Sequence, residues 1–535
     1  MSNTILHLKR YWVLHTATIL AAAMVWISTL QGPGVGGDAT IYITSAKNLV
    51  RGIGLGLINP DGSFRLIPYF PPFYPLVLSL FAMLHMDVVT AARWLDILLF
   101  AGTVFIVLKT TDDFLHNWQF SLALGMLLAV SPVLVPVYSW VMSEPLSIFL
   151  GILALVLALQ AWKQPQKKFL LHLSALFAGL SALTRYGAVV YAAAIFGLLL
   201  FYWHGKFLQR MKSALLYALE SALPLIIWMI VDLKLTDTVS SRSVPTLAGI
   251  GARFVGFFID IKSVILFWLL PDSWITDPFY PGWMNTLIVI VFILALGIGS
   301  WFLIKRTDSN ADMQRLTVGL VLFCGLYVLM TLVIVLATYP PITIGTRMFS
   351  PMNLMVLWLL VLILYAIWQA GKKEPLISTA ALLAVIIFTL WSGWRGARII
   401  DYNRTTGLGF QSAQWQSSDL ISYIQSIPED KALVSNEEMA VLYLTGRRAY
   451  PLAEIYFDQS VFDFYSYGTG QSPDAGELQF RQGAYLILFN SIYDQLSGLY
   501  GNRTEERINQ MTDGLKLVYH GKDGNVFLFN KSVEE

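Results

Sequence analysis

The stretch GGDATIY, residues 36–42, follows directly after the first long apolar run and opens a loop rich in glycine and proline. Its acid, Asp38, stands about where a spanning helix would leave the bilayer. A carboxylate at that depth is costly unless it faces water or a partner, so a functional role is one interpretation. A helix cap is the other, because Asp is a favoured capping residue and an apolar-periodic segment follows. The stretch alone favours neither interpretation.

The composition is that of a polytopic membrane protein. Of the 535 residues, 56% are hydrophobic and only 13% are charged, whereas average soluble proteins carry roughly 25% charged residues. The net charge of +2 argues against a nucleic-acid partner. Cys324 is the single cysteine, which excludes a disulfide or a cysteine-based metal site within one chain. The seven histidines are scattered and show no metal-ligand spacing.

Apolar runs long enough to cross a bilayer follow one another up to residue 394. A spanning helix needs about 20 apolar residues. The runs predict about eleven spans: 11–30, 88–108, 117–137, 144–162, 169–184, 186–203, 213–232, 284–304, 316–338, 350–370 and 376–394. Residues 73–86 are apolar but short, which suits an interfacial or re-entrant helix, and we expect 256–270 to be interfacial as well.

Two of these spans have alternatives. The run 11–30 resembles a cleaved signal peptide, but many equally apolar segments follow, and Lys9 and Arg10 serve equally well as a cytoplasmic anchor. The pair between 169 and 203 is short for two crossings and suits one long tilted helix. Arg185 at its middle favours instead a hairpin whose bend lies at the interface.

Clusters of lysine and arginine orient the spans, because cytoplasmic loops carry an excess of these residues. With eleven spans and a cytoplasmic N-terminus, all clusters fall inside: Lys9/Arg10, Lys109, Lys163/Lys167/Lys168, Lys206/Arg210/Lys212, Lys305/Arg306/Arg315 and Lys372/Lys373. Counting 73–86 as a span would place most of them outside. The same orientation puts the first loop, 31–87, on the outer face with Glu144, Arg185 and Arg347.

Residues 395–535 differ from the rest, since charged residues are frequent and turn signals recur. We expect an amphipathic helix at 419–427, strands at 431–434 and 485–489, and a β-hairpin of 515–519 with 526–529. The predicted fold class is therefore mainly α: a polytopic helical membrane domain, residues 1–394, with interfacial helices. A small α/β domain, residues 395–535, follows it on the extracytoplasmic face.

Two acids and two arginines on the outer face suggest a particular chemistry. Arginine forms bidentate hydrogen bonds to phosphate, so Arg185 and Arg347 are candidates to hold a lipid phosphate or pyrophosphate. A carboxylate can take a proton from an acceptor hydroxyl that attacks a sugar carbon, and arginines stabilise the departing phosphate. Asp38 is the candidate base. Glu144 is its candidate partner, to orient the acceptor or to join Asp38 in binding an optional divalent cation.

Simpler interpretations stand beside each of these. Ser143 or Glu144 caps the next helix equally well, with Pro145 in its first turn. Arg185 and Arg347 suit snorkelling anchors at helix ends. Lys47, with Arg51, forms a solvated face or contacts lipid headgroups. The aromatic residues around the Pro-Pro pair, Tyr74 among them, form an interfacial belt or a platform on which a sugar stacks.

Short motifs occur in a fixed order along the chain: Gly37-Asp38-Ala39-x-x-Tyr42, Ala46-Lys47-Asn48-Leu49, Pro71-Pro72-x-Tyr74-Pro75, Ala91-Ala92-Arg93, Ser143-Glu144-Pro145-Leu146, Leu183-Thr184-Arg185-Tyr186-Gly187 and Arg347-Met348-Phe349-Ser350-Pro351. Together they resemble the GT-C superfamily of membrane glycosyltransferases, in the branch that contains the protein O-mannosyltransferases and the lipid A aminoarabinose transferase. Residues 435–451 resemble the outer domain of many bacterial members.

The resemblance implies an inverting transferase that uses a polyprenyl-phosphate sugar. Asp38 matches the catalytic acid of the first loop, Glu144 the second acid, and Arg185 and Arg347 the positive groups near the donor phosphate. Tyr42, Lys47 and Tyr74 lie in the same motifs and are further candidates for substrate binding. Many relatives carry a lysine before the Pro-Pro pair, where this chain has Phe70. A phosphate contact made by that lysine is therefore not carried over to this chain.

We therefore expect a cell-envelope enzyme, a hexosyl- or pentosyltransferase, that moves a sugar from a polyprenyl-phosphate donor to a glycan, lipid or protein hydroxyl. A transporter or flippase of lipid-linked saccharides is the first rival. Against it, the chain shows no internal repeat, and the candidate polar groups lie at one face rather than near the midplane. A non-catalytic envelope assembly protein is the second rival, and it would make Asp38 and Glu144 dispensable.

Overall fold

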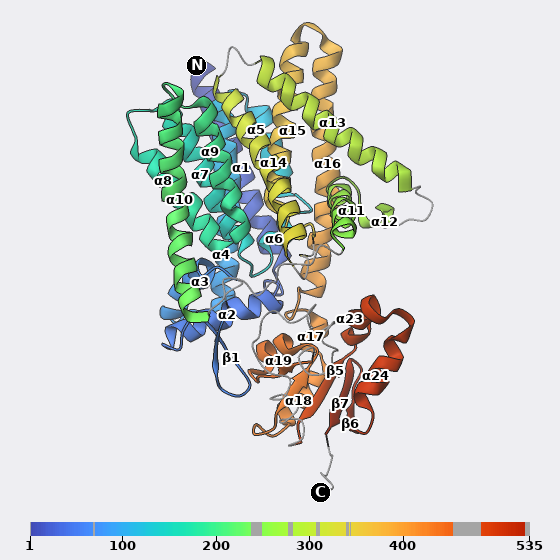
Figure 1. Ribbon diagram of the computed structural model, residues 1–535. Helices are drawn as coiled ribbons and strands as arrows, with labels where there is room; N and C mark the ends of the chain where they lie inside the picture. Colours follow the sequence, from blue (N-terminus) through green and yellow to red (C-terminus); the bar gives the residue numbers. More distant parts are fainter. Residues whose placement is uncertain are drawn as a thin grey trace.

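The computed structural model describes residues 2–67, 70–236, 249–275, 282–306, 311–338, 342, 344–452 and 483–529. A bundle of long helices forms the larger part, and a small sheet covered by short helices lies beyond one end of it (Figure 1). The chain begins at the opposite end of the bundle from this sheet. The first loop lies at the same end as the sheet, next to the lower ends of the long helices in Figure 1.

A helix stands at each predicted span. These helices are α1 (Ser2–Ser28), α4 (Val88–Leu115), α5 (Trp118–Ala129), α7 (Glu144–Lys163), α8 (Phe169–Thr184), α9 (Val189–Tyr202), α10 (Phe207–Thr236), α13 (Gly282–Arg306), α14 (Ala311–Ala337), α15 (Ser350–Ala370) and α16 (Pro375–Thr406). Within the described residues, eight of them are long and apolar enough to cross a membrane, and α5, α8 and α9 are shorter. The predicted fold class, a polytopic helical membrane protein, is confirmed.

The segment between 169 and 203 forms two helices rather than one long helix. Arg185 takes an extended conformation, with φ −153° and ψ 121°, directly after α8. A short 3-10 turn, Tyr186–Ala188, then leads into α9. Both α8 and α9 pack against α7 and against α10, so they lie side by side (Figure 1). The predicted bend at Arg185 is therefore confirmed.

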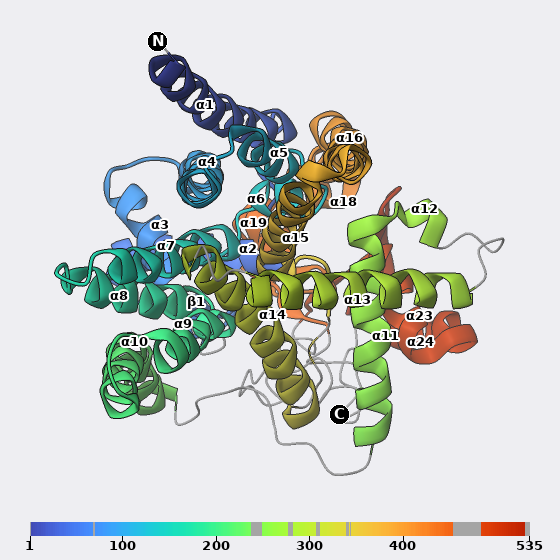
Figure 2. The same ribbon diagram turned by 90° about the horizontal axis from the view of Figure 1, so that it is seen from above.

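The shorter elements of the membrane part lie across the bundle or at its end. The first loop contains α2 (Gly37–Val50), the hairpin of β1 (Gly56–Ile58) and β2 (Phe64–Leu66), and α3 (Phe73–Met83). A short helix, α6 (Leu134–Tyr138), precedes α7. Helix α11 (Ile250–Leu269), which α12 (Asp272–Ile275) follows, is seen end-on in Figure 1 and lengthwise in Figure 2. It crosses the bundle axis, as an interfacial segment does.

The sheet-containing part has five strands in the order β4-β3-β5-β7-β6. The strands β4 (Tyr450–Pro451), β3 (Leu433–Ser435) and β5 (Tyr485–Phe489) are parallel, whereas β7 (Gly524–Leu528) and β6 (Lys516–His520) form an antiparallel hairpin. The helices are α17 (Ala413–Gln416), α18 (Asp419–Ser426), α19 (Glu438–Thr445), α23 (Ser491–Tyr500) and α24 (Thr504–Thr512). The predicted helix, strands and hairpin are confirmed, with ends shifted by a few residues.

Helices cover both faces of this sheet, which explains the unbroken apolar run of β5. Leu486 and Leu488 pack on one face with side chains of α23 and α24. Ile487 and Phe489 pack on the other face with side chains of α18. Strands that are buried on both faces read as continuous apolar runs rather than as alternating ones.

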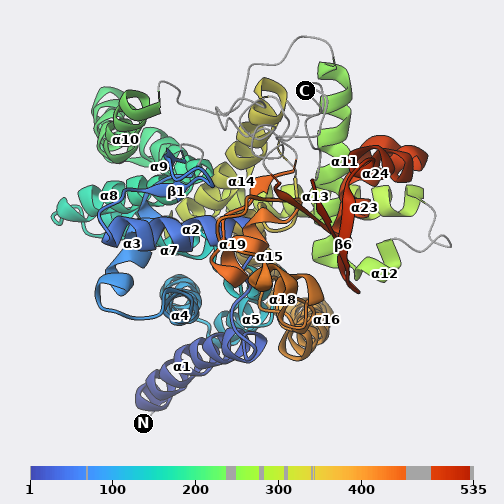
Figure 3. The ribbon, with the colours of Figure 1, turned by 90° about the horizontal axis from the view of Figure 1, so that it is seen from below.

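The sheet-containing part docks onto the first loop. Helix α19 lies beside α2 when the molecule is seen from below (Figure 3). Met439 of α19 packs against the small cluster that contains Ile41 and Leu57. Ala440 is fully buried in the same core as the bundle helices. Helix α16 carries the chain without a break from the bundle to this docked part.

Candidate active site

Asp38 lies in the first turn of α2 and does not cap it. The N-cap position belongs to Gly36, so the cap interpretation of Asp38 is wrong. The carboxylate benefits from the positive end of the helix dipole. Its side chain is 36% exposed and forms an ion pair with Arg347, with 3.1 Å between Oδ2 and Nη2.

The backbone just before α2 is clamped between two distant segments. The amide of Gly34 donates to the Ser139 carbonyl at 2.8 Å, and the Val141 amide donates to the Gly34 carbonyl at 2.9 Å. On the other side, the Phe410 amide donates to the Val35 carbonyl at 2.7 Å. A Cβ on Gly34 would stand 2.4 Å from the indole of Trp140, so a side chain cannot fit there. This clamp fixes where α2, and with it Asp38, begins.

Glu144 is the first residue of α7, and its side chain is 1% exposed. Ser143 occupies the N-cap position without a capping side-chain bond, and Pro145 stands in the first turn. The Ser143 hydroxyl instead shares a hydrogen bond with the Tyr42 hydroxyl at 3.3 Å. A buried carboxylate needs a partner of opposite charge, and Glu144 has two of them.

The two acids and two arginines form one continuous cluster, which we call the acid–arginine cluster: Asp38, Glu144, Arg185 and Arg347. Glu144 Oε1 lies 3.0 Å from Arg185 Nη1 and 3.1 Å from Arg347 Nε. Arg347 thus contacts both carboxylates, since its Nη2 reaches Asp38. The predicted convergence of these four side chains is a feature of the structure, and the order of pairing is Arg185–Glu144–Arg347–Asp38.

The members of the cluster come from separate elements at the same end of the bundle. Asp38 belongs to α2, Glu144 to α7, and Arg185 to the residue that follows α8. Arg347 stands in the turn that leads into α15. Helix α2 lies across this end of the bundle, next to the docked α19 (Figures 1 and 3).

Tyr42 and Tyr74 are buried beside the cluster rather than open to a ligand, with 2% and 0% exposure. The Tyr42 ring packs edge-on against Tyr74, with ring centroids 5.1 Å apart, and against Phe70 at 4.8 Å. Burial, with Asp38 and Glu144 nearby, raises the pKa of Tyr42, so its phenol stays neutral. The aromatic group therefore supports the start of α7 through Ser143.

Lys47 lies apart from the cluster. It is an exposed residue near the C-terminal end of α2, nine positions after Asp38. A helix rises 1.5 Å per residue, which separates the two by roughly 13 Å along the axis. Lys47 lines a different pocket, next to Arg51.

The structure adds residues that were not singled out from the sequence. Met142 accepts a contact from Arg347 through its sulfur, which lies 3.3 Å from Nη1. The Tyr327 hydroxyl, on α14, donates to the Met348 carbonyl and so holds the turn that carries Arg347. Asp96, on α4, is fully buried near Tyr74. An acid inside an apolar span is a signal that could have identified Asp96, whereas the contacts of Tyr327 and Met142 join segments far apart in sequence.

The cluster does not fit a resident metal ion as it stands. Arg347 occupies the place between the two carboxylates and supplies the positive charge that a cation would bring. Among the described residues, no group of three or more His, Cys, Asp or Glu side chains is placed to hold a metal. The optional divalent cation therefore enters no step below.

Comparison with known proteins gives a family match for part of the chain. The model of the dolichyl-phosphate-mannose-protein mannosyltransferase family matches residues 70–228. This range includes Glu144 and Arg185 and leaves out Asp38 and Arg347. A search of the curated proteins gave no match.

Solved structures match over almost the whole chain. ArnT from Cupriavidus metallidurans, in the apo state, is 10% identical with a TM-score of 0.57, and the match covers 96% of this chain and 97% of that one. The chain has the GT-C glycosyltransferase fold. AglB from Archaeoglobus fulgidus, bound to an inhibitory peptide and a dolichol-phosphate, is 11% identical with a TM-score of 0.55. That match covers 98% of this chain and 75% of AglB.

Mycobacterial AftD, an arabinofuranosyltransferase, also shares the GT-C fold, at 14% identity and a TM-score of 0.54. The match covers 98% of this chain and 40% of AftD. The family model and these structures all belong to glycosyltransferases, which confirms the resemblance read from the sequence motifs.

Proposed function

We propose that this chain is an integral-membrane glycosyltransferase that moves one sugar from a polyprenyl-phosphate donor to an acceptor hydroxyl on the extracytoplasmic face. The observation that carries the proposal is the acid–arginine cluster, which gathers two carboxylates and two guanidinium groups at one end of the bundle. The AglB structure with a dolichol-phosphate, a lipid phosphate bound to the same fold, supports the donor class.

The excess of lysine and arginine in alternate loops supports a cytoplasmic N-terminus. The first loop and the sheet-containing part lie at the end of the bundle opposite the N-terminus. With a cytoplasmic N-terminus, we propose that this end is the extracytoplasmic one. In this proposal, residues 1–394 form the catalytic membrane domain and residues 395–535 the outer domain.

Asp38 acts as the general base in this scheme, because it is the accessible acid of the cluster. It is 36% exposed, whereas Glu144 is 1% exposed and held by two arginines. Asp38 takes the proton of the acceptor hydroxyl as that oxygen forms a bond to the anomeric carbon of the sugar. The bond between this carbon and the phosphate oxygen breaks, and its electron pair leaves with the lipid phosphate.

Arg185 and Arg347 bind the departing phosphate in the proposed reaction. Guanidinium groups aimed at a position where negative charge develops lower the barrier most effectively in a site shielded from water. Glu144 positions both of them, since it contacts one nitrogen of each. Glu144 thus acts through the arginines, and Asp38 acts on the acceptor.

The proposal is tested by lipid mass spectrometry of cells that lack the gene and are complemented with variants. We expect a polyprenyl-phosphate sugar to accumulate without the gene and with Asp38→Asn, because the acceptor hydroxyl is no longer deprotonated. Asp61→Asn is the matched control: Asp61 is an exposed acid of the same loop that contacts its neighbour Ser63. This control should restore the wild-type lipid profile.

Normal turnover by purified Asp38→Asn would disprove the assignment of the base. Movement of unmodified lipid across liposomes without a new glycosidic bond would identify a transporter instead. Western blotting and size-exclusion chromatography of each variant verify that a loss of activity does not come from a loss of folded protein.

A further inference from the structure

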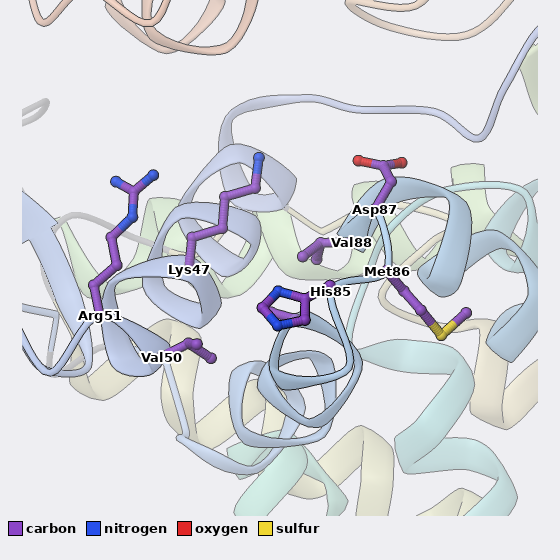
Figure 4. A pocket seen from close by; sticks show the side chains of 8 residues that line it. Lys47, Val50, Arg51, His85, Met86, Asp87 and Val88 are labelled. Carbon is purple, nitrogen blue, oxygen red and sulfur yellow. The ribbon is translucent and has the colours of Figure 1, made fainter.

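A pocket lies in the first loop, away from the acid–arginine cluster. It is a cavity of about 480 Å³ between the C-terminal end of α2 and the turn that joins α3 to α4. Lys47 and Val50 line it from α2, and Arg51 lines it from the position just after this helix (Figure 4). His85, Met86 and Asp87 line it from the turn. We call it the loop pocket. Its mixture of basic and apolar groups suggests an amphiphilic ligand.

The charge of the loop pocket is positive. Among the described residues, Lys47, Arg51 and His85 form no ion pair with an acid. The acid in the lining, Asp87, is engaged elsewhere, because it caps α4 by accepting the Thr90 amide at 2.8 Å. Two permanent cations and an imidazole therefore line the pocket together with the single carboxylate of Asp87, so the net charge of the lining is positive.

The wall that carries His85 is preformed. His85 has a left-handed backbone conformation with φ 58°, which places it at the end of α3 where glycine is the usual residue. The His85 amide donates to the Ala82 carbonyl at 3.0 Å, and the Met86 amide donates to the Phe81 carbonyl at 3.1 Å. These two bonds fix the turn, so the imidazole stands on the pocket wall without ordering of the backbone on binding.

The outer surface of α3 next to the pocket is apolar and exposed. Leu80, Met83 and Leu84 are 58%, 62% and 71% exposed, and Met86 in the pocket lining is 44% exposed. A contiguous apolar surface of this kind on a membrane protein faces acyl chains. The loop pocket thus lies where the exposed apolar surface of α3 adjoins the basic side chains. This arrangement suits a phospholipid, whose acyl chains are apolar and whose headgroup carries a phosphate.

We propose that the loop pocket binds the phosphate headgroup of an anionic phospholipid of the outer leaflet, whose acyl chain lies along the exposed side of α3. Lys47 and Arg51 pair with the phosphate, and His85 donates to one of its oxygens. The lipid is distinct from the sugar donor, because a donor phosphate has to reach Arg347 and Arg185. Apart from the outward orientation of this end, the proposal is independent of the proposed transferase activity.

The test uses the full-length protein, purified in detergent and titrated with dioleoylphosphatidylglycerol or dioleoylphosphatidylcholine under native mass spectrometry. We expect the wild type to retain the anionic lipid in preference to the zwitterionic one. Each basic group near an anionic headgroup contributes roughly fivefold to affinity, so Lys47→Gln/Arg51→Gln should weaken binding of the anionic lipid roughly 25-fold.

The matched control is Arg398→Gln/Arg404→Gln, which removes two exposed charges from the same end of the molecule, near the end of α16. This control should retain the anionic lipid. Size-exclusion profiles verify that each variant is folded. If the double pocket variant aggregates, the single variant Arg51→Gln replaces it, with an expected loss of roughly fivefold in affinity for the anionic lipid.

Three outcomes would overturn the proposal. The first is unchanged binding of dioleoylphosphatidylglycerol by a folded pocket variant. The second is an equal loss in the control, which would mean that overall charge is responsible. The third concerns undecaprenyl phosphate, which is added as a competitor of the anionic phospholipid. If the pocket variant loses only the binding of undecaprenyl phosphate, the pocket belongs to the donor.

Discussion

At the scale of single residues, Arg347 is the centre of the site. Its Nε contacts Glu144 and its Nη2 contacts Asp38, at 3.1 Å each. Two donors on one planar group, pointing toward two carboxylates, are a geometry that lysine cannot reproduce. The position of Arg347 also depends on the Tyr327 hydrogen bond to the Met348 carbonyl.

Arg347→Lys should therefore impair the enzyme although it keeps the charge. We expect the rate of sugar transfer to fall about 100-fold, the usual cost of losing one group that stabilises developing charge. Arg185→Lys is the comparison, because the Arg185 contact with Glu144 uses a single nitrogen, and its loss should be smaller. Rates are measured with the donor lipid that accumulates in the deletion strain, and equal rates for wild type and Arg347→Lys would contradict this account.

The four members of the cluster could be selected from the sequence because they are ionisable, adjoin apolar runs and fall on one predicted face. The pairing within the cluster could not be predicted, since nothing in the sequence tells which oxygen of Glu144 each arginine contacts. Tyr74, which the sequence offers as a candidate for substrate binding or for an interfacial belt, is fully buried. An aromatic residue next to a Pro-Pro pair has the same sequence pattern whether it packs inward or faces a substrate.

At the scale of elements, the length of the apolar runs predicts the spans, and each predicted span is a helix. The clamp before α2 could not be predicted from the sequence, because it pairs Gly34 with Trp140 and Val35 with Gly409, which are far apart in the chain. The packing of α16 has the same long-range character. A Cβ on Gly396 would stand 2.2 Å from the Val130 carbonyl oxygen, so the helix approaches that backbone closely.

Two glycines of α16 give a matched pair for this contact. Gly396→Ala should destabilise the protein by about 1 to 3 kcal/mol, because the neighbouring atom is backbone and cannot turn away. Gly393→Ala should be neutral or stabilising by about 0.5 to 1 kcal/mol, since its Cβ would meet a Val130 methyl at an ordinary 3.6 Å. Thermal melts in one detergent at one scan rate compare the two, and equal melting temperatures would refute the close approach.

At the scale of the whole molecule, sidedness connects the sequence to the function. The lysine and arginine clusters predict one orientation, and the structure places the first loop, the acid–arginine cluster and the sheet-containing part together at one end. A bundle whose polar site lies at one end suits chemistry on a lipid headgroup at that surface. A transport pathway would instead place its polar groups near the midplane.

Cysteine labelling on intact cells tests this orientation. In a Cys324→Ser background, a membrane-impermeant maleimide should label Asp61→Cys in the first loop and Lys516→Cys on β6, both of which are exposed. Lys167→Cys, exposed between α7 and α8, should react after the cells are opened and not before. Labelling of Lys167→Cys on intact cells would reverse the orientation and, with it, the proposed side of the reaction.

The sharing of Glu144 between two arginines has a consequence for biosynthesis. Membrane proteins are made and inserted from the N-terminus, so Glu144 and Arg185 enter the bilayer within neighbouring spans. The buried acid therefore meets its first counter-ion early. Arg347, separated from Asp38 by 309 residues, arrives only with a late helix. The chain thus inserts with the Glu144–Arg185 pair already in place, and the four-residue cluster is complete only after residue 347 of the 535 has been made.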